Sequence, residues 1–206
     1  MNTVLILSYT KDVAYYNMLK ECIKSIDADC NIVVVETNSN LKGKDIKLPA
    51  QFIFPEEEFN YNRFLNIGFS HIRDSKKVII SNNDVIYDKG CIEKLFKSLD
   101  VYDSVSPSET KMSKNIEGNT VGKLVKGWCI GLSMEVYNRM GEWDENFSFW
   151  YQDNDYCNFI SREKFKHCLI GDAVATHRVS ASHNLISNIH EMTHGLEDIL
   201  HAKWVK

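Results

Sequence analysis

Clustered amide and carboxylate side chains follow a short apolar run in the middle of the sequence. Val78–Ser81 is predicted to be a buried β-strand, and Asn82, Asn83 and Asp84 come directly after it. In open α/β sheets, ligands bind beyond the carboxyl ends of the strands. Oxygen ligands of this kind suit Mg²⁺ or Mn²⁺, and these ions in turn suit diphosphates. The tripeptide also suits a plain turn, because Asn and Asp favour turns.

Two further positions carry groups that could do chemistry. Aromatic residues and carboxylates alternate between Trp143 and Cys157, and an amphipathic helix is predicted to begin at Asp153 or Asn154. A carboxylate that opens a helix can also be an N-cap, so a structural role for Asp153 stays open. His177 stands at the end of the last apolar segment, where a histidine can bind a metal or simply be partly buried and hydrogen-bonded.

The first hundred residues alternate strands with helices, and these elements must position the polar groups. Apolar runs predict strands at Val4–Tyr9, Asn31–Glu36, Phe52–Phe54 and Val78–Ser81. Spacings of three and four predict helices at Val13–Ile26, Phe59–Ile72 and Gly90–Leu99. Strand, helix and strand at this length form a βαβ unit, so the sheet is predicted to be mostly parallel. The predicted fold class is α/β, a single Rossmann-like domain with helices on both faces of its sheet.

The pattern changes after Asp100. Residues 106–126 are polar and lysine-rich, which predicts a mobile loop or an irregular strand pair. Beyond them we expect a strand at Gly127–Ser133, a helix at Met134–Met140, a strand at His167–Ile170, and a segment, Ala173–Arg178, that leaves the sheet. We divide the chain into one domain at 1–180, with halves at 1–100 and 101–180, and a helical tail at 181–206.

Composition narrows the class of protein. The chain has 206 residues with 44% apolar and 25% charged residues, as in soluble globular proteins. A net charge of −4 and a pI near 6.0 give no electrostatic case for nucleic acid or an anionic membrane. Six scattered cysteines, the absence of a membrane-length apolar run, and an N-terminus without a signal-peptide pattern predict a cytoplasmic protein with buried thiols. No Gly-x-Gly-x-x-Gly follows the first strand, which argues against a dinucleotide oxidoreductase.

The order of these motifs resembles that of a GT-A fold glycosyltransferase, most closely glycosyltransferase family 2. The matching positions, in chain order, are Ser8 and Tyr9 after the first strand, Glu36 and Ser39 after the second, Arg63, Asn66 and Gly68 on the second helix, Asn82-Asn83-Asp84, Gln152-Asp153, and His177. The segment Phe59–Phe69 and the stretch Trp150–Asp155 also resemble motifs of β-1,4-galactosyltransferases. The resemblance covers about residues 3–180.

The resemblance implies a donor site and a metal site. It places the nucleotide-sugar donor, preferably a UDP-sugar, against Ser8, Tyr9, Glu36, Ser39, Arg63, Asn66 and Asn83. It implies that Asp84 and His177 bind Mn²⁺ or Mg²⁺, with Asn82 as a neutral, weaker ligand. A cation is useful there because negative charge develops on the diphosphate as it leaves.

The resemblance also implies an acceptor site and an inverting reaction. Asp153 is the candidate general base for the acceptor hydroxyl. Gln152 stands where the family has Glu, and Trp128, Trp150 and Asp155 are the other candidate acceptor contacts. The acceptor, whether a glycan, a protein, a small molecule or a modified nucleic acid, is left open. So are the oligomeric state and the role of the C-terminal helix, which could cover the acceptor side or mediate dimerisation.

Two other functions are compatible with the sequence. His190-Glu191-Met192-Thr193-His194 matches the His-Glu-x-x-His pattern of zinc proteases, although Glu197 stands where a metzincin glycine would be, and an ordinary amphipathic helix explains the spacing. The second alternative function is that of a catalytically inactive domain that binds a nucleotide sugar or glycan. It is compatible with the sequence because Asn82 and Gln152 carry amides where the family has acids.

Overall fold

The chain begins with the predicted βαβ unit. The computed structural model describes residues 1–178 and 194–205. In it β1 (Asn2–Ser8) runs parallel to β2 (Asn31–Glu36), and α1 (Val13–Ser25) connects them. Asp12 caps α1 by accepting hydrogen bonds from two backbone amides of the first turn.

The other elements alternate in the same way up to α3 and then become more varied. They are η1 (Ser39–Leu41), β3 (Gln51–Ile53), α2 (Tyr61–Ser70), β4 (Lys77–Asn82), β5 (Val85–Tyr87), α3 (Cys91–Ser98), β6 (Ser104–Ser108), β7 (Ile116–Glu117), β8 (Cys129–Ser133), α4 (Met134–Met140), α5 (Gln152–Arg162), β9 (His167–His177) and α7 (Leu196–Trp204). The predicted helices and strands of the first hundred residues are confirmed to within a few residues at their ends.

One nine-stranded sheet runs through both halves of the chain, in the order β3-β2-β1-β4-β8-β6-β9-β5, with β7 paired to β9. The first four of these strands are parallel, as predicted. Beyond β4 the sheet is mixed, because β8 is antiparallel to both β4 and β6. The α/β class is thus confirmed, and the division at residue 100 falls within one continuous sheet.

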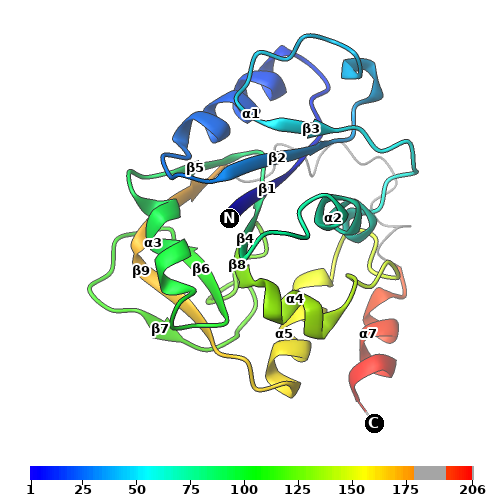
Figure 1. Cartoon of the computed structure of the whole chain (residues 1–206). Coiled ribbons are helices and arrows are strands. Elements are labelled where there is room, and N and C mark those ends of the chain that lie inside the picture. Colours follow the sequence, from blue (N-terminus) through cyan, green and yellow to red (C-terminus); the bar gives the residue numbers. More distant parts are fainter. Residues whose placement is uncertain (179–193, 206) are drawn as a thin grey trace.

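Helices cover both faces of the sheet, and each face has its own core. One core joins α1 and α3 to the sheet through residues such as Leu19, Ile23 and Leu95. The other joins α2, α4 and α5 to the opposite face through residues such as Phe69 and Tyr156. Figure 1 shows these two groups of helices on opposite sides of the strands.

The second half of the chain contains strands that the sequence pattern does not predict. Residues 106–126 are predicted to form a mobile loop or an irregular strand pair; in the structure residues 106–108 belong to β6, a buried strand in the middle of the sheet. Its serines are buried because they have partners; Ser106 Oγ, for example, donates to the carbonyl of Cys129 at 3.0 Å. The expectation that Ala173–Arg178 leaves the sheet was also wrong, because β9 continues to His177 and pairs there with β5.

The expectation of buried, unpaired thiols is confirmed. All six cysteines are free and five of them are buried. Burial raises the pKa of the Cys22 and Cys129 thiols to about 12, so both are neutral at physiological pH. In the described part of the chain no helix is long and apolar enough to cross a membrane. Of the predicted tail helix, residues 181–193 lie outside the described residues, and α7 forms the rest.

A buried histidine joins β9 to the segment before β8. His167 Nε2 lies 3.1 Å from the carbonyl of Leu124, so this nitrogen carries the proton, and Nδ1 accepts a hydrogen bond from Ser104 Oγ at 2.8 Å. Tyr156 donates in turn to Ser104 Oγ. Burial lowers the pKa of His167 to about 4, because a charged imidazolium is poorly solvated there.

We therefore expect His167 to make folding stability depend on pH. Its pKa is lower in the folded state than the ordinary value near 6.5, so the unfolded chain binds the extra proton. The contribution is fully present above pH 6.5 and is lost as the pH falls towards 4, about 3 kcal/mol in total. Urea unfolding of the wild type and His167→Gln at several pH values measures it. The difference between the two curves should fall with decreasing pH; a constant difference would contradict the assignment.

Candidate active site

The carboxyl ends of β1, β2 and β4 meet at one edge of the sheet. Ser8 lies opposite Glu36 in the register, and Leu7 lies opposite Asn82. A cavity of about 420 Å³ opens beside the end of β4. Its lining brings together the predicted site residues Asn82, Trp128, Trp150, Gln152, Asp153 and His177, and adds Tyr61, Lys126 and the backbone of Gly127.

Asp84 pairs with His177, which lines this cavity. They meet because Val85, the first residue of β5, lies opposite His177 in β9. His177 Nε2 is 3.1 Å from Asp84 Oδ1, and the Asp84 side chain is only 4% exposed. The indole of Trp128 stacks on the imidazole of His177, with ring centroids 5.1 Å apart and planes 13° from parallel, which holds the ring in place.

This pair fits a divalent cation. Asp84 Oδ1 is buried without a well-formed hydrogen bond in the described structure, and a buried carboxylate oxygen needs a partner. Two ligand atoms at right angles on one Mg²⁺ lie about 3.0 Å apart, close to the observed separation. Across residues 1–178 and 194–205 no group of three or more His, Cys, Asp or Glu is placed to hold a metal ion. Mg²⁺ is often bound by one or two carboxylates together with substrate phosphates.

Asn82 has a different partner from the one the resemblance implies. Its Oδ1 accepts a hydrogen bond from the hydroxyl of Tyr61 at 3.3 Å. Burial, and then the charges of Asp153 and Asp84, raise the pKa of Tyr61 well above its usual value, so the hydroxyl stays neutral and remains a donor. Tyr61 therefore lies close to both carboxylates of the candidate site. Tyr61 lies within the segment Phe59–Phe69 that the sequence analysis names, but its contact with Asn82 joins residues that are distant in the sequence.

Asp153 also lines the cavity. It lies in the first turn of α5, and its Oδ1 accepts a hydrogen bond from the amide of Asn154 at 3.0 Å. A Cβ at position 127 would lie 2.8 Å from Asp153 Oδ2, so any larger residue there would displace the end of the Asp153 side chain. Burial raises the pKa of Asp153 above its usual value. Next to it, Gln152 Oε1 is buried and has no hydrogen-bond partner among the described residues.

A lysine that the sequence analysis treated as surface also lines the cavity. The side chain of Lys126 is only 11% exposed. Its ammonium group binds Glu109 Oε2 at 2.8 Å and the carbonyl of Gly122 at 3.1 Å. Lys126 ends the lysine-rich segment 106–126, and its sequence neighbours do not distinguish it from the other lysines there. Its burial depends on its contacts with Glu109 and Gly122.

Glu36, the predicted nucleobase contact, is fully buried and binds the chain itself. Its two carboxylate oxygens accept hydrogen bonds from the amide and hydroxyl of Thr10 and from the amide of Asn38, at 2.7–2.9 Å. Asn83 Nδ2 donates to Ser8 Oγ at 3.1 Å, and both residues are buried. These bonds hold the loops after β1 and β2 together. Tyr9 and Ser39 are exposed beside them.

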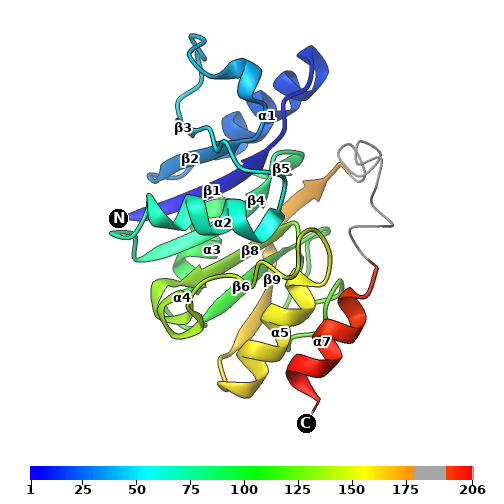
Figure 2. The same cartoon turned by 90° about the vertical axis from the view of Figure 1, so that its right-hand side faces the viewer.

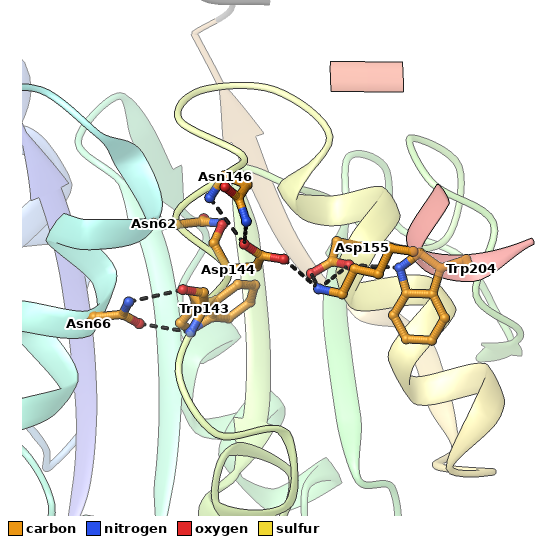
Figure 3. A network of polar contacts seen from close by, with 8 residues as sticks. Asn62, Asn66, Trp143, Asp144, Asn146, Asp155 and Trp204 are labelled. Carbon is orange, nitrogen blue, oxygen red and sulfur yellow. Dashed lines mark hydrogen bonds and ion pairs between the residues drawn. The ribbon is translucent and has the colours of Figure 1, made fainter. Parts of the chain in front are cut away.

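Arg63 and Asn66 point to the segment before α5. Arg63 Nε donates to Glu145 Oε2 at 2.8 Å, and Asn66 both donates to the carbonyl and accepts from the amide of Trp143. Asn62 donates to the carbonyl of Asp144, so one face of α2 holds residues 143–145 (Figure 3). Sequence reasoning assigned Arg63 and Asn66 to the donor; the structure shows them holding the chain that leads to Asp153.

Asp155, a predicted acceptor contact, points away from the cavity. Its carboxylate accepts a hydrogen bond from the indole of Trp204 at 2.7 Å and pairs with Lys203 at 2.9 Å, both in α7. Trp150, in contrast, is 45% exposed at the cavity. Of the zinc-protease pattern, His190 and Glu191 lie outside the described residues, and His194 is exposed.

The sheet order and the site at its carboxyl edge define a GT-A fold of the glycosyltransferase type. Solved structures similar to the chain include S. aureus TarS 1–349 in complex with UDP-GlcNAc (TM-score 0.66, 11% identity, 100% of this chain and 67% of that one). GalNAc-T7 with UDP, GalNAc and Mn²⁺ is also similar (TM-score 0.69, 10% identity, 86% of this chain and 43% of that one). A third is S. aureus TarS 1–349 (TM-score 0.62, 11% identity, 84% of this chain and 59% of that one), so the chain spans about three fifths of that structure. No protein-family model matches the sequence, and no curated protein matches it either.

We expect Asn66→Ala to destabilise the protein through the segment before α5. The substitution leaves the amide and carbonyl of Trp143, a buried residue, without their partners, at a cost of about 1–3 kcal/mol in the free energy of unfolding. Urea denaturation measures it. Ser70→Ala, on the exposed end of the same helix, is the matched control and should change stability by less than about 0.5 kcal/mol. Equal effects of the two variants would show that Asn66 does not hold this segment.

Proposed function

We propose that the protein is a metal-dependent inverting glycosyltransferase, which moves a sugar from a nucleotide-diphosphate donor to an acceptor hydroxyl. One cavity carries the proposal: it is lined by His177, which pairs with Asp84, and by Asp153 and Tyr61. The similar structures support a UDP-sugar donor, since TarS is solved with UDP-GlcNAc and GalNAc-T7 with UDP, GalNAc and Mn²⁺.

In this proposal Asp84 and His177 would hold Mn²⁺ or Mg²⁺, and the bound ion would neutralise negative charge on the diphosphate leaving group. Asp153 takes the proton of the acceptor hydroxyl while that oxygen forms a bond to the anomeric carbon. The bond from the anomeric carbon to the diphosphate oxygen breaks, and its electron pair leaves with the nucleoside diphosphate. With one base opposite the leaving group, the reaction is a single displacement that inverts the anomeric configuration.

The surroundings of Asp153 suit a general base. Burial raises its pKa, which makes the carboxylate a stronger base than one in water. Because position 127 is a glycine, no side chain from that position lies against Asp153 Oδ2. Gln152 contributes a buried amide oxygen that can accept a hydrogen bond from an acceptor hydroxyl, but an amide cannot take the proton.

A binding domain without turnover is the second candidate. It is favoured by Gln152, which stands where the resemblance has a carboxylate, and by Asn82, whose Oδ1 is already bound to Tyr61. The two functions share the donor and metal site. They differ in the role of Asp153, which matters for catalysis only in the transferase.

We expect UDP and Mn²⁺ together to stabilise the wild type and not Asp84→Asn. At a UDP concentration 100 times its dissociation constant, binding to the folded state adds about 2.7 kcal/mol, or about 5–10 °C in melting temperature. Asn removes the charge that pairs with the metal and keeps the shape. Asp88→Asn, four residues further along and exposed, is the matched control and should keep the full shift. A UDP shift in the wild type that is independent of Mn²⁺ would count against the metal site.

We expect Asp153→Asn to lower turnover and leave donor binding unchanged. A positioned general base contributes about 10²–10⁴ to the rate, so the rate of UDP release from a UDP-sugar should fall by at least about 100-fold. The UDP-induced rise in melting temperature should match that of the wild type. If the wild type binds UDP with Mn²⁺ but releases none from any UDP-sugar in the presence of acceptors, the binding domain is the better description.

A further inference from the structure

The first turn of α5, which carries Asp153, lacks the usual means of fixing a helix start. Its N-cap residue, Tyr151, has a φ of 67°, the left-handed conformation that non-glycine residues rarely adopt. No side chain caps the helix there. Helix starts leave four backbone amides without helical partners, and a missing cap costs about 1 kcal/mol. Within the turn, the amide of Asn154 donates to Asp153 Oδ1, and contacts from outside the helix add to what fixes its position.

Those contacts come from α7, the helix near the C-terminus. Trp204 Nε1 donates to Asp155 Oδ1 at 2.7 Å, and Lys203 Nζ lies 2.9 Å from the same oxygen. Residues two apart in a helix point to nearly opposite sides. Asp155 thus faces α7 while Asp153 faces the cavity, and Figure 2 shows α7 lying along α5.

Lys203 also joins α5 to the segment that leads into it. Its ammonium group binds Asp144 Oδ2 at 2.8 Å as well as Asp155. The backbone of Asp144 is held in turn by Asn62 from α2. Figure 3 shows this chain of contacts running from α2 through Asp144 to Asp155 and Trp204. One cation therefore compensates two carboxylates, one on each side of the turn before α5.

We propose that α7 positions the catalytic base: Lys203 and Trp204 hold Asp144 and Asp155, and thereby fix the first turn of α5 with Asp153 in the cavity. Lys203 and Trp204 are positioning residues, because they bind α5 on the side opposite Asp153. This inference rests on the proposed transferase function for its effect on turnover. The structural link itself does not depend on that function.

Lys203→Met tests the proposal, since methionine keeps much of the apolar stem and removes the charge. Asp144 and Asp155 are then left without their cation, and the turn can shift. A displacement of about 1 Å can cost up to about 100-fold in rate, so we expect kcat for UDP release to fall about 10- to 100-fold with little change in donor KM. Lys203→Arg should restore most of kcat. Trp204→Phe, which removes only the N–H donor from the ring, should give a smaller loss of kcat.

The matched control lies at the other end of the same helix. Arg139 pairs with Glu163, the residue that directly follows the end of α5. Arg139→Met therefore removes an ion pair to a carboxylate at the end of α5 that is far from Asp153. It should lower stability slightly and leave kcat unchanged. If Lys203→Met keeps the wild-type kcat, or if Arg139→Met lowers kcat equally, the positioning role is wrong.

Hydrogen exchange separates failure of this inference from failure of the proposed function. Lys203→Met should speed exchange of the amides of Asn154 and Asp155 relative to those of residues 157–162, whether or not the protein is a transferase. Unchanged exchange at the first turn would overturn the inference. Faster exchange in a protein whose wild type releases no UDP would confirm the structural link and overturn only its stated effect on catalysis.

Discussion

The antiparallel pairing of β5 with β9 is the contact on which the candidate site depends. Val85 lies opposite His177, and this register brings Asp84, the residue before β5, against a histidine from the far end of the domain. β9 is fixed in turn by its long pairing with β6 in the core. The Asp84–His177 pair is therefore set by the register of the sheet. A one-residue slip of β9 would turn the imidazole to the other face of the strand.

Much of the fold follows from local sequence pattern, because the first half of the chain obeys it. Buried parallel strands are continuous apolar runs, as at Val78–Ile80, and amphipathic helices lie between them. The pattern does not predict β6, since its sequence Ser-Val-Ser-Pro-Ser is that of a loop. Its serines are accommodated in the core by hydrogen bonds to Cys129 and His167, which are distant in the sequence.

The candidate site could be predicted in its outline and not in its details. The resemblance singles out Asp84, His177 and Asp153; in the structure His177 and Asp153 line one cavity and Asp84 pairs with His177. The sequence does not show which polar side chains form hydrogen bonds within the protein and are therefore not available to a ligand. Glu36, Asn66 and Asp155 all have suitable types at suitable positions, yet each binds another part of the protein. A buried carboxylate needs a partner, and only tertiary structure decides whether that partner is a ligand or a neighbouring loop.

The two cores of the protein contain different cysteines, so a reagent that modifies thiols can report on each core separately. Cys22, Cys91 and Cys129 belong to the core under α1 and α3, whereas Cys157 belongs to the core under α2, α4 and α5. Burial raises the pKa of the Cys157 thiol to about 12, as it does for Cys22 and Cys129, so these thiols react only when the surrounding layer opens. Alkylation of the native chain, followed residue by residue, would thus compare the opening of the layer on one side of the sheet with that of the layer that supports α5. The natural cysteines can in this way show which of the two cores opens more readily, without any introduced probe.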